Sequence, residues 1–208
     1  MLILASLSPR RSELLQAAGL PFKVRACEVD ESIEEGETPH AYVQRLAKKK
    51  ALAIEIHPDE VILGADTTVA VADEILGKPA NDEEARRMLT KLSARRHEVY
   101  TGVCLRSSRQ ITTRVACTGV WFEKLTKAEI DDYVRSGEPL DKAGAYAIQG
   151  LASKFIPRID GSYSNVVGLP VDLVYRMLKE HTSAGSVFDD PFARHVARPR
   201  NPELKLEQ

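Results

Sequence analysis

Apolar runs and amphipathic stripes alternate along the first 180 residues of the chain. Residues 2–6 and 61–63 are almost continuously apolar, which is typical of strands that are covered on both faces. Two longer segments rich in β-branched residues flank the polar turn 106–110 and predict a hairpin. The strands expected from these patterns are 2–6, 61–71, 97–105, 111–122, 146–148 and 155–159.

Helices are expected where apolar residues recur every three or four positions behind a capping residue. Ser8 and Thr38, each followed by proline, begin two of them. Asn81 and Thr126, each with a glutamate three positions later, begin two more. The expected helices are 8–19, 38–57, 81–92, 126–137 and 170–179, with Leu14, Leu15 and Ala18 inward on the first, Val43, Leu46, Ala47, Ala51 and Ile54 on the second, and Val171, Val174, Tyr175 and Leu178 on the last.

This succession of strands and helices predicts an α/β domain with a mixed sheet. At 208 residues, 43% hydrophobic and 28% charged, the chain can bury one sizeable core. Prolines and charges replace the periodic pattern after the last helix. We therefore expect the domain to span 1–182 and residues 183–208 to form a flexible tail.

Charge and cysteine content narrow the partners and the compartment. With 29 Lys+Arg against 30 Asp+Glu, the net charge is -1, so no overall attraction to a nucleic acid polymer or an anionic membrane is expected. The N-terminal apolar run is too short for a membrane helix. Cys27, Cys104 and Cys117 lack zinc-ligand spacing, and we expect buried thiols in a reducing cytoplasm. Any polyanion must then be bound locally.

The first expected helix begins with two cations, Arg10 and Arg11, at its positive end. This arrangement becomes favourable if an anion binds at the corner where the first strand turns into this helix. Free backbone N–H groups, the hydroxyls of Ser6 and Ser8 and two guanidinium groups would then converge on phosphate oxygens. The alternative is a pair of solvated surface arginines.

Two further charged residues are expected to point inward. Lys50 falls about 20° from Val43 around the second helix, so it lies with the apolar stripe, whereas Lys48 and Lys49 lie off it. Its partner is either an anion in a cleft or, for a snorkelling lysine, water. Asp66 ends a buried run and needs a partner there, either as a helix or turn cap or as a metal ligand or general base.

Three more positions extend this charged region. Glu31 belongs to an acidic loop, Lys78 precedes a proline that makes its turn rigid, and Gln149 ends a segment of small residues that lets a flat ligand approach. A solvated loop is the alternative for Glu31 and a surface turn for Lys78, and the signal at Gln149 is weak by itself. Together, cations for several phosphates and acids for a divalent metal ion indicate metal-assisted phosphoanhydride chemistry. Neither GxxxxGK[ST] nor GxGxxG is present, which argues against a P-loop NTPase and a Rossmann dehydrogenase.

The ordered motifs resemble those of the Maf-type nucleoside triphosphate pyrophosphatases over residues 1–180. The matching segments are LASLSPRR at 4–11, DES at 30–32, LAKKKA at 46–51, GADT at 64–67, GKP at 77–79, LDKAGAY at 140–146, IQG at 148–150 and GSYSNVVGLP at 161–170. The resemblance implies the inosine triphosphate pyrophosphatase-like fold, with a mixed central sheet flanked by helices and two lobes around a nucleotide cleft. It also implies a homodimer.

The activity implied by the resemblance is hydrolysis of a nucleoside triphosphate to the monophosphate and pyrophosphate with Mg²⁺ or Mn²⁺. Fixed cations would stabilise the charge on the leaving pyrophosphate. The roles carried over by the resemblance are Asp66 as proton acceptor, Lys50 and Lys78 as further catalytic residues, Ser6, Ser8 and Arg11 as polyphosphate ligands, Glu31 and Asp66 as metal ligands, and Arg10, Thr67 and Gln149 as determinants of base specificity.

The last three positions are similar to the branch that acts on dTTP and UTP. This similarity implies house-cleaning or control of pyrimidine nucleotide pools, modified uridine triphosphates included. A glutamine both donates and accepts hydrogen bonds, as a pyrimidine edge does. Two alternatives stay open: a pyrophosphatase for 7-methyl-GTP or another modified nucleotide, and a nucleotide-binding regulator of cell division. One departure is Asn81, where the family has Asp. Asn caps a helix equally well, so we expect the fold to tolerate it.

Overall fold

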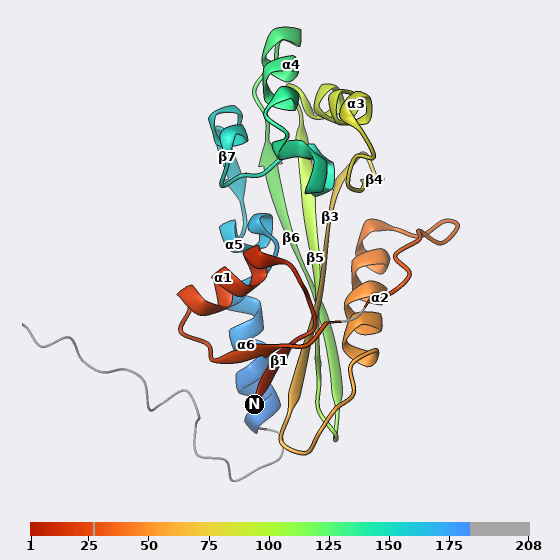
Figure 1. Ribbon diagram of the computed structural model, residues 1–208, viewed down its shortest axis with the longest axis vertical. Helices are drawn as coiled ribbons and strands as arrows, with labels where there is room; N and C mark the ends of the chain where they lie inside the picture. Colours follow the sequence, from red (N-terminus) through yellow and green to blue (C-terminus); the bar gives the residue numbers. More distant parts are fainter. Residues whose placement is uncertain (27, 184–208) are drawn as a thin grey trace, which may run out of the picture.

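Three long strands form the central axis of the protein. The computed structural model describes residues 1–26 and 28–183. β3 (Val61–Val71), β5 (Arg96–Arg106) and β6 (Ile111–Trp121) are paired antiparallel and run side by side along most of the length of the molecule (Figure 1). The predicted hairpin is therefore confirmed. Of the tail expected at 183–208, Ser183 belongs to α6, whereas 184–208, like Cys27, lie outside the described residues.

Four short strands complete a mixed sheet. Their bounds are β1 (Leu2–Leu4), β2 (Phe22–Val24), β4 (Glu74–Leu76) and β7 (Arg158–Asp160). The strand order is β2-β1-β3-β5-β6-β7. β4 is outside this order and pairs with the same edge of β3 as β1, further along the strand. β1 is parallel to both of its neighbours, whereas the other pairs are antiparallel. The mixed sheet expected from the sequence is confirmed.

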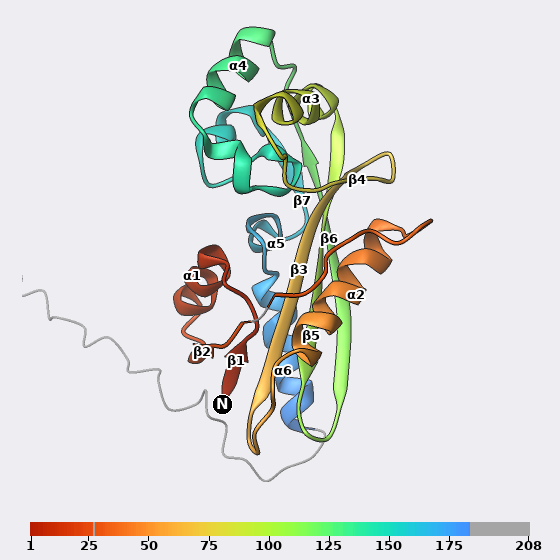
Figure 2. The same cartoon turned by 45° about the vertical axis from the view of Figure 1, so that its right-hand side comes forward.

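Helices divide the molecule into two lobes along this sheet. They are α1 (Pro9–Ala17), α2 (Pro39–Leu52), α3 (Asp82–Leu92), α4 (Lys127–Arg135), α5 (Tyr163–Val167) and α6 (Val171–Ser183). In the first lobe α2 packs on one face of the sheet, and α1 and α6 pack on the other (Figure 2). α3 and α4 belong to the second lobe, which has a core of its own.

The capping signals in the sequence place three helix starts correctly. The Thr126 hydroxyl accepts from the Glu129 N–H, and the Glu129 carboxylate accepts from the Thr126 N–H, which completes the capping box. Asn81 caps α3 by accepting from the Glu84 N–H at 2.9 Å. The tolerance expected of this asparagine is thus confirmed for the helix cap. Thr38 caps α2 in the same way.

Several local predictions are wrong. Residues 146–148 form a loop and turn, because Gly144 and Ala145 have positive φ values that break the extended chain before them. Residues 155–159 contain only the start of β7, and a 3₁₀ turn, Leu151–Phe155, precedes them. α2 ends at Leu52 instead of near residue 57. The sequence pattern also missed β2, β4 and α5, which are too short to show a period.

Burial corrects three side-chain assignments. Ala18 is exposed, because α1 ends at Ala17 and Ala18 is its C-cap, and Tyr175 is exposed with its ring beneath Lys179 instead of in the core. Cys117 is an exposed free thiol on β6, whereas Cys104 is buried as expected. The stripe expected on α2 is buried throughout.

Two glycines set the distance between α2 and the sheet. A Cβ at Gly102 on β5 would overlap the backbone carbonyl oxygen of Val43, and a Cβ at Gly64 on β3 would overlap that of Ala47. The helix backbone therefore rests directly on the strands, closer than any other residue type would allow.

A histidine is buried in the core of the second lobe. His97 has no exposed surface and packs edge-on against the rings of Phe122 and Tyr146, at centroid distances of 5.2 and 5.4 Å. Its Nε2 lies 2.8 Å from the Tyr146 hydroxyl. Burial lowers the pKa of His97 from 6.5 to about 4, so the imidazole is neutral at physiological pH.

This buried imidazole should make the protein sensitive to mild acid. In the unfolded chain His97 regains its ordinary pKa and binds a proton between pH 6.5 and 4, whereas in the folded chain it does not. The free energy of unfolding should therefore decrease as the pH is lowered through this window, by about 3 kcal/mol in total. Urea unfolding at several pH values measures this slope. The slope should become shallower in His97→Gln, and an equal slope in both proteins would contradict the assignment.

Candidate active site

The candidate site lies where β3 changes its partner. β1 pairs with β3 as far as Leu63, and β4 pairs with the same edge from Val69 onwards. Between them no described strand covers this edge, and Asp66 and Thr67 lie there at the wall of a cavity of about 330 Å³. Residues of both lobes line the cavity, so it is a cleft between the lobes, as the expected fold requires.

Successive residues of β3 face opposite sides of the sheet, and Asp66 faces α2. Its Oδ1 accepts a hydrogen bond from Lys50 Nζ at 2.6 Å, and the same ammonium lies 2.6 Å from Oε1 of Glu31. The Lys50 side chain is only 13% exposed, so the predicted inward orientation is confirmed, and its partner is a carboxylate pair. Burial raises the pKa of Asp66, and the charges of Lys50 and Arg11 oppose this rise.

Thr67 faces the opposite side, where it meets Arg11. The guanidinium donates to the Ser6 hydroxyl at 2.9 Å, to the Gly168 carbonyl at 2.9 Å and to the Thr67 hydroxyl at 3.2 Å. The Thr67 hydroxyl also lies 2.9 Å from that of Thr101. Arg11 is 8% exposed, which excludes the solvated alternative for this arginine.

The corner between β1 and α1 offers unshared donors to the cleft. Ser8 begins α1, yet among the described residues its side chain makes no capping hydrogen bond and the first turn of the helix holds no acid. Ser8, Arg10 and Arg11 all line the cavity. An anion here would meet backbone N–H groups and cations together.

The second lobe supplies the facing wall. Lys78 lies exposed at the cavity, and the described residues provide it with no ion pair. Arg10 spans the cleft to Asp141, with 3.5 Å between Nη1 and Oδ2. Gln149 is exposed at the same wall, beside the small residues that the sequence singled out. Nine of the ten candidate residues thus line one cleft, and the tenth, Ser6, contacts Arg11 behind its wall.

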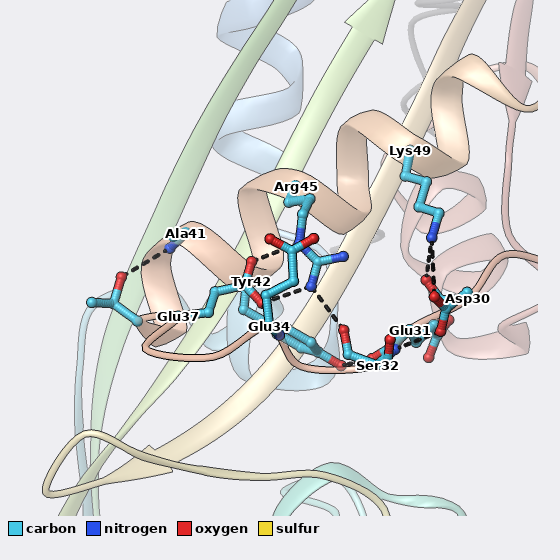
Figure 3. A network of polar contacts seen from close by, with 10 residues as sticks. Asp30, Glu31, Ser32, Glu34, Glu37, Ala41, Tyr42, Arg45 and Lys49 are labelled. Atoms are coloured by element: carbon cyan, nitrogen blue, oxygen red, sulfur yellow. Dashed lines mark hydrogen bonds and ion pairs between the residues drawn. The ribbon is translucent and has the colours of Figure 1, made fainter.

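Helix α2 also fixes the acidic loop that carries Glu31, a role that the sequence analysis missed (Figure 3). Lys49 donates to the carbonyl of Asp30 at 2.8 Å, Tyr42 to that of Glu31 at 3.0 Å and Arg45 to that of Ser32 at 2.9 Å. These three donors are spaced i, i+3 and i+7, so they form one stripe of the helix. Three consecutive carbonyl groups are therefore held by side chains of a single helix.

Two further features strengthen this attachment. Arg45 forms a two-point ion pair with Glu37, with N–O distances of 2.6 Å. Burial, together with the charges of Asp66 and Glu31, raises the pKa of Tyr42 to about 12, so its hydroxyl keeps its proton at neutral pH. The i, i+3, i+7 spacing was visible in the sequence, but nothing there indicated that backbone carbonyls would be the partners.

The carboxylates of Glu31 and Asp66 fit a divalent metal ion. Both lie against Lys50 Nζ, so their oxygens are close together, and carboxylate oxygen is the donor that Mg²⁺ and Mn²⁺ prefer. Within residues 1–26 and 28–183, no group of three or more His, Cys, Asp or Glu side chains could hold a metal ion. Mg²⁺ commonly binds through one or two carboxylates and substrate phosphates, which matches a pair better than a closed cage.

Comparison with known proteins places this cleft in a family. The sequence profile described as Maf-like protein matches residues 1–181. The chain belongs to the Maf-like family. It is 49% identical over 190 residues to a protein of Pseudoalteromonas atlantica named dTTP/UTP pyrophosphatase, covering 87% of this chain and 99% of the relative. A protein of the same name from Anaeromyxobacter dehalogenans is 53% identical over 174 residues, covering 82% and 88%.

Solved structures give more distant matches. The Ham1 protein of Staphylococcus aureus is similar at a TM-score of 0.49 and 13% identity, over 86% of this Maf-like chain and 98% of the other. A HAM1 protein from Coxiella burnetii is similar at a TM-score of 0.48 and 14% identity, over 86% and 98%. None of the described helices combines the length and the hydrophobicity that a membrane span requires.

Proposed function

We propose that this Maf-like protein hydrolyses dTTP and UTP to the nucleoside monophosphate and pyrophosphate. The observation that carries the proposal is the convergence, in one cleft, of a buried carboxylate, Asp66, with cations from both lobes. Relatives at about 50% identity that bear this name support the choice of substrate. The alternative of a binding module without catalysis has no use for a buried acid whose pKa is raised.

The proposed chemistry begins with Asp66. Its carboxylate accepts a proton from the attacking water, and burial keeps the pKa high enough for the group to act as a base. Lys50 orients this carboxylate and stabilises negative charge near it. When bound by Glu31 and Asp66, Mg²⁺ or Mn²⁺ would neutralise charge on the phosphates. Lys78, from the other lobe, would stabilise the charge on the leaving pyrophosphate.

Polyphosphate binding is assigned to the corner at the start of α1. Arg11 and Ser6 form a rigid pair there, Ser8 adds a hydroxyl, and the first turn of α1 adds the backbone N–H groups that a helix leaves unpaired at its start. For base selection we retain Arg10, Thr67 and Gln149. The Thr67 hydroxyl already contacts Arg11, so its contribution would be to hold this wall of the cleft in place.

Three further expectations stay predictions: the homodimer, the cytoplasmic location and the use of modified uridine triphosphates. Nothing in the described part of the chain argues for 7-methyl-GTP over a pyrimidine nucleotide. That alternative is decided by measuring substrates directly.

The deciding experiment is pyrophosphate release from dTTP, UTP, CTP, dATP, GTP and 7-methyl-GTP. Each nucleotide is tested with Mg²⁺, with Mn²⁺ and with a chelator. We expect metal-dependent release that favours dTTP and UTP. Preference for 7-methyl-GTP would replace the substrate and keep the chemistry. Thermal stabilisation by nucleotide without release at any metal concentration would favour the regulatory module.

A further inference from the structure

The segment that carries Gln149 is held from behind by a carboxylate. Glu138, at the start of a 3₁₀ turn (Glu138–Asp141), lies against the backbone of Gly150 so closely that a Cβ there would overlap its carboxyl group. Its Oε2 accepts a hydrogen bond from the Leu151 N–H at 3.0 Å. Only glycine at position 150, directly after Gln149, leaves room for this carboxylate.

The other end of the segment is held by a tyrosine. Tyr133 on α4 is 3% exposed and donates its hydroxyl hydrogen to Glu138 Oε1 at 2.7 Å. The same hydroxyl oxygen accepts from the Ala147 N–H at 3.2 Å. Burial and the bond to Glu138 raise the pKa of Tyr133, which keeps this donor protonated. Tyr133 and Glu138 thus form a relay that reaches both ends of residues 147–151.

The held segment forms part of the cleft. Ala147, Ile148 and Gln149 all line the cavity, whereas Tyr133 and Glu138 do not. Gln149 is exposed, and no hydrogen bond from the described residues restrains its side chain, so its position depends on its backbone. A further turn bond, from the Gly150 N–H to the Ala147 carbonyl, closes the segment on itself. Tyr133 and Glu138 therefore fix the backbone position from which the Gln149 side chain enters the cleft.

We propose that Tyr133 and Glu138 are positioning residues for base recognition, acting through the backbone of residues 147–151. This inference rests on the proposed function, because it assigns the held segment to the base of a nucleotide. Neither residue reaches the phosphate corner at α1, which lies in the other lobe. Their influence should fall on the choice among nucleotides and spare phosphate binding.

The test compares base-dependent and base-independent binding in Tyr133→Phe, which removes one hydroxyl and leaves the ring. KM for dTTP and UTP should rise about tenfold, the cost of a lost buried hydrogen bond, with little change in kcat. The ratio of kcat/KM for dTTP to that for CTP should fall by a similar factor. The inhibition constant of inorganic tripolyphosphate, which has no base, should stay unchanged. Glu138→Gln should act in the same direction, because an amide has a single acceptor oxygen and cannot accept from both the Tyr133 hydroxyl and the Leu151 N–H.

Two controls separate positioning from general loosening. Ile130→Val shortens a core residue one turn earlier on the same helix and leaves the relay intact, so discrimination should be unchanged. In a Gln149→Ala background, Tyr133→Phe should cause no further loss of discrimination. The proposal is overturned if Ile130→Val reproduces the loss, if tripolyphosphate binding weakens in parallel, or if the effects of Tyr133→Phe and Gln149→Ala simply add.

Failure of the proposed hydrolysis can be distinguished from failure of the relay. The dissociation constants of α,β-imido-dTTP and α,β-imido-CTP, measured by calorimetry, require no turnover. A wild-type protein that releases no pyrophosphate would refute the hydrolysis alone. Equal affinity ratios in the wild type and Tyr133→Phe would refute the relay.

Discussion

Replacing Asp66 by asparagine is expected to lower kcat for pyrophosphate release by about a thousandfold, the usual range for loss of a general base. The amide has nearly the same shape but cannot take a proton from water, and it no longer pairs electrostatically with Lys50. The substitution should not unfold the protein. Because burial raises the pKa of Asp66, the ionised group costs stability at neutral pH, and its removal relieves that cost.

The pH dependence gives this prediction a second readout. In the wild type, kcat should fall at low pH as Asp66 gains a proton, and the fall should begin above the ordinary carboxyl pKa because the pKa is raised. The residual activity of Asp66→Asn should lack this limb. Asp172→Asn, an exposed residue paired with Arg176 on α6, is the matched control and should keep full activity. Undiminished hydrolysis by Asp66→Asn would remove Asp66 from the chemistry.

Replacing Gly102 by alanine is expected to damage both stability and activity. The added methyl group would overlap the Val43 carbonyl, so α2 must move away from β5 or the strand must bend. Overpacking of this kind costs about 3 kcal/mol of unfolding free energy. The shift also moves Lys50 relative to Asp66, and misplacement by about 1 Å can lower turnover about a hundredfold. Urea unfolding and steady-state kinetics on the same preparation measure the two effects.

The matched control for stability is Gly77→Ala. A Cβ at Gly77 meets no atom within 4 Å, and the residue does not have a positive φ, so its unfolding free energy should change by less than about 1 kcal/mol. If Gly102→Ala were as stable as this control, α2 could accommodate a methyl group at this position, and the predicted steric overlap would be refuted. If Gly102→Ala were unstable but kept full turnover per folded molecule, the position of α2 would not determine the catalytic placement of Lys50 relative to Asp66.

How far the sequence could predict the site depends on how each residue is held. Lys50 was predictable because a helical period places it beside Val43, and Asp66 because a buried run cannot end in an unpaired charge. Arg11 was predictable from its conflict with the helix dipole. Each of these signals is local, since it depends only on neighbours along the chain.

The residues that support the site gave no such signal. Tyr42 and Tyr133 act on backbone groups 11 and 14 positions away, and these contacts arise only when a helix and an irregular loop fold against each other. An apolar stripe carries no information about which carbonyl a hydroxyl will meet. The same reason explains the wrong strand at 146–148: the segment has strand-like composition, but its backbone is held by Tyr133 and is paired with none of the described strands.

β3, β5 and β6 belong to both lobes, and this continuity limits how the cleft can move (Figure 2). A hinge in a loop would let the lobes rotate as separate bodies through a change in a few dihedral angles. Here the lobes can approach only if the three paired strands flex together, and the strain is spread over many hydrogen bonds. The paired strands therefore resist a change in the width of the cleft. We therefore expect a ligand to fit a gap whose width is largely set before binding, and selection among ligands to depend on that spacing more than on closure.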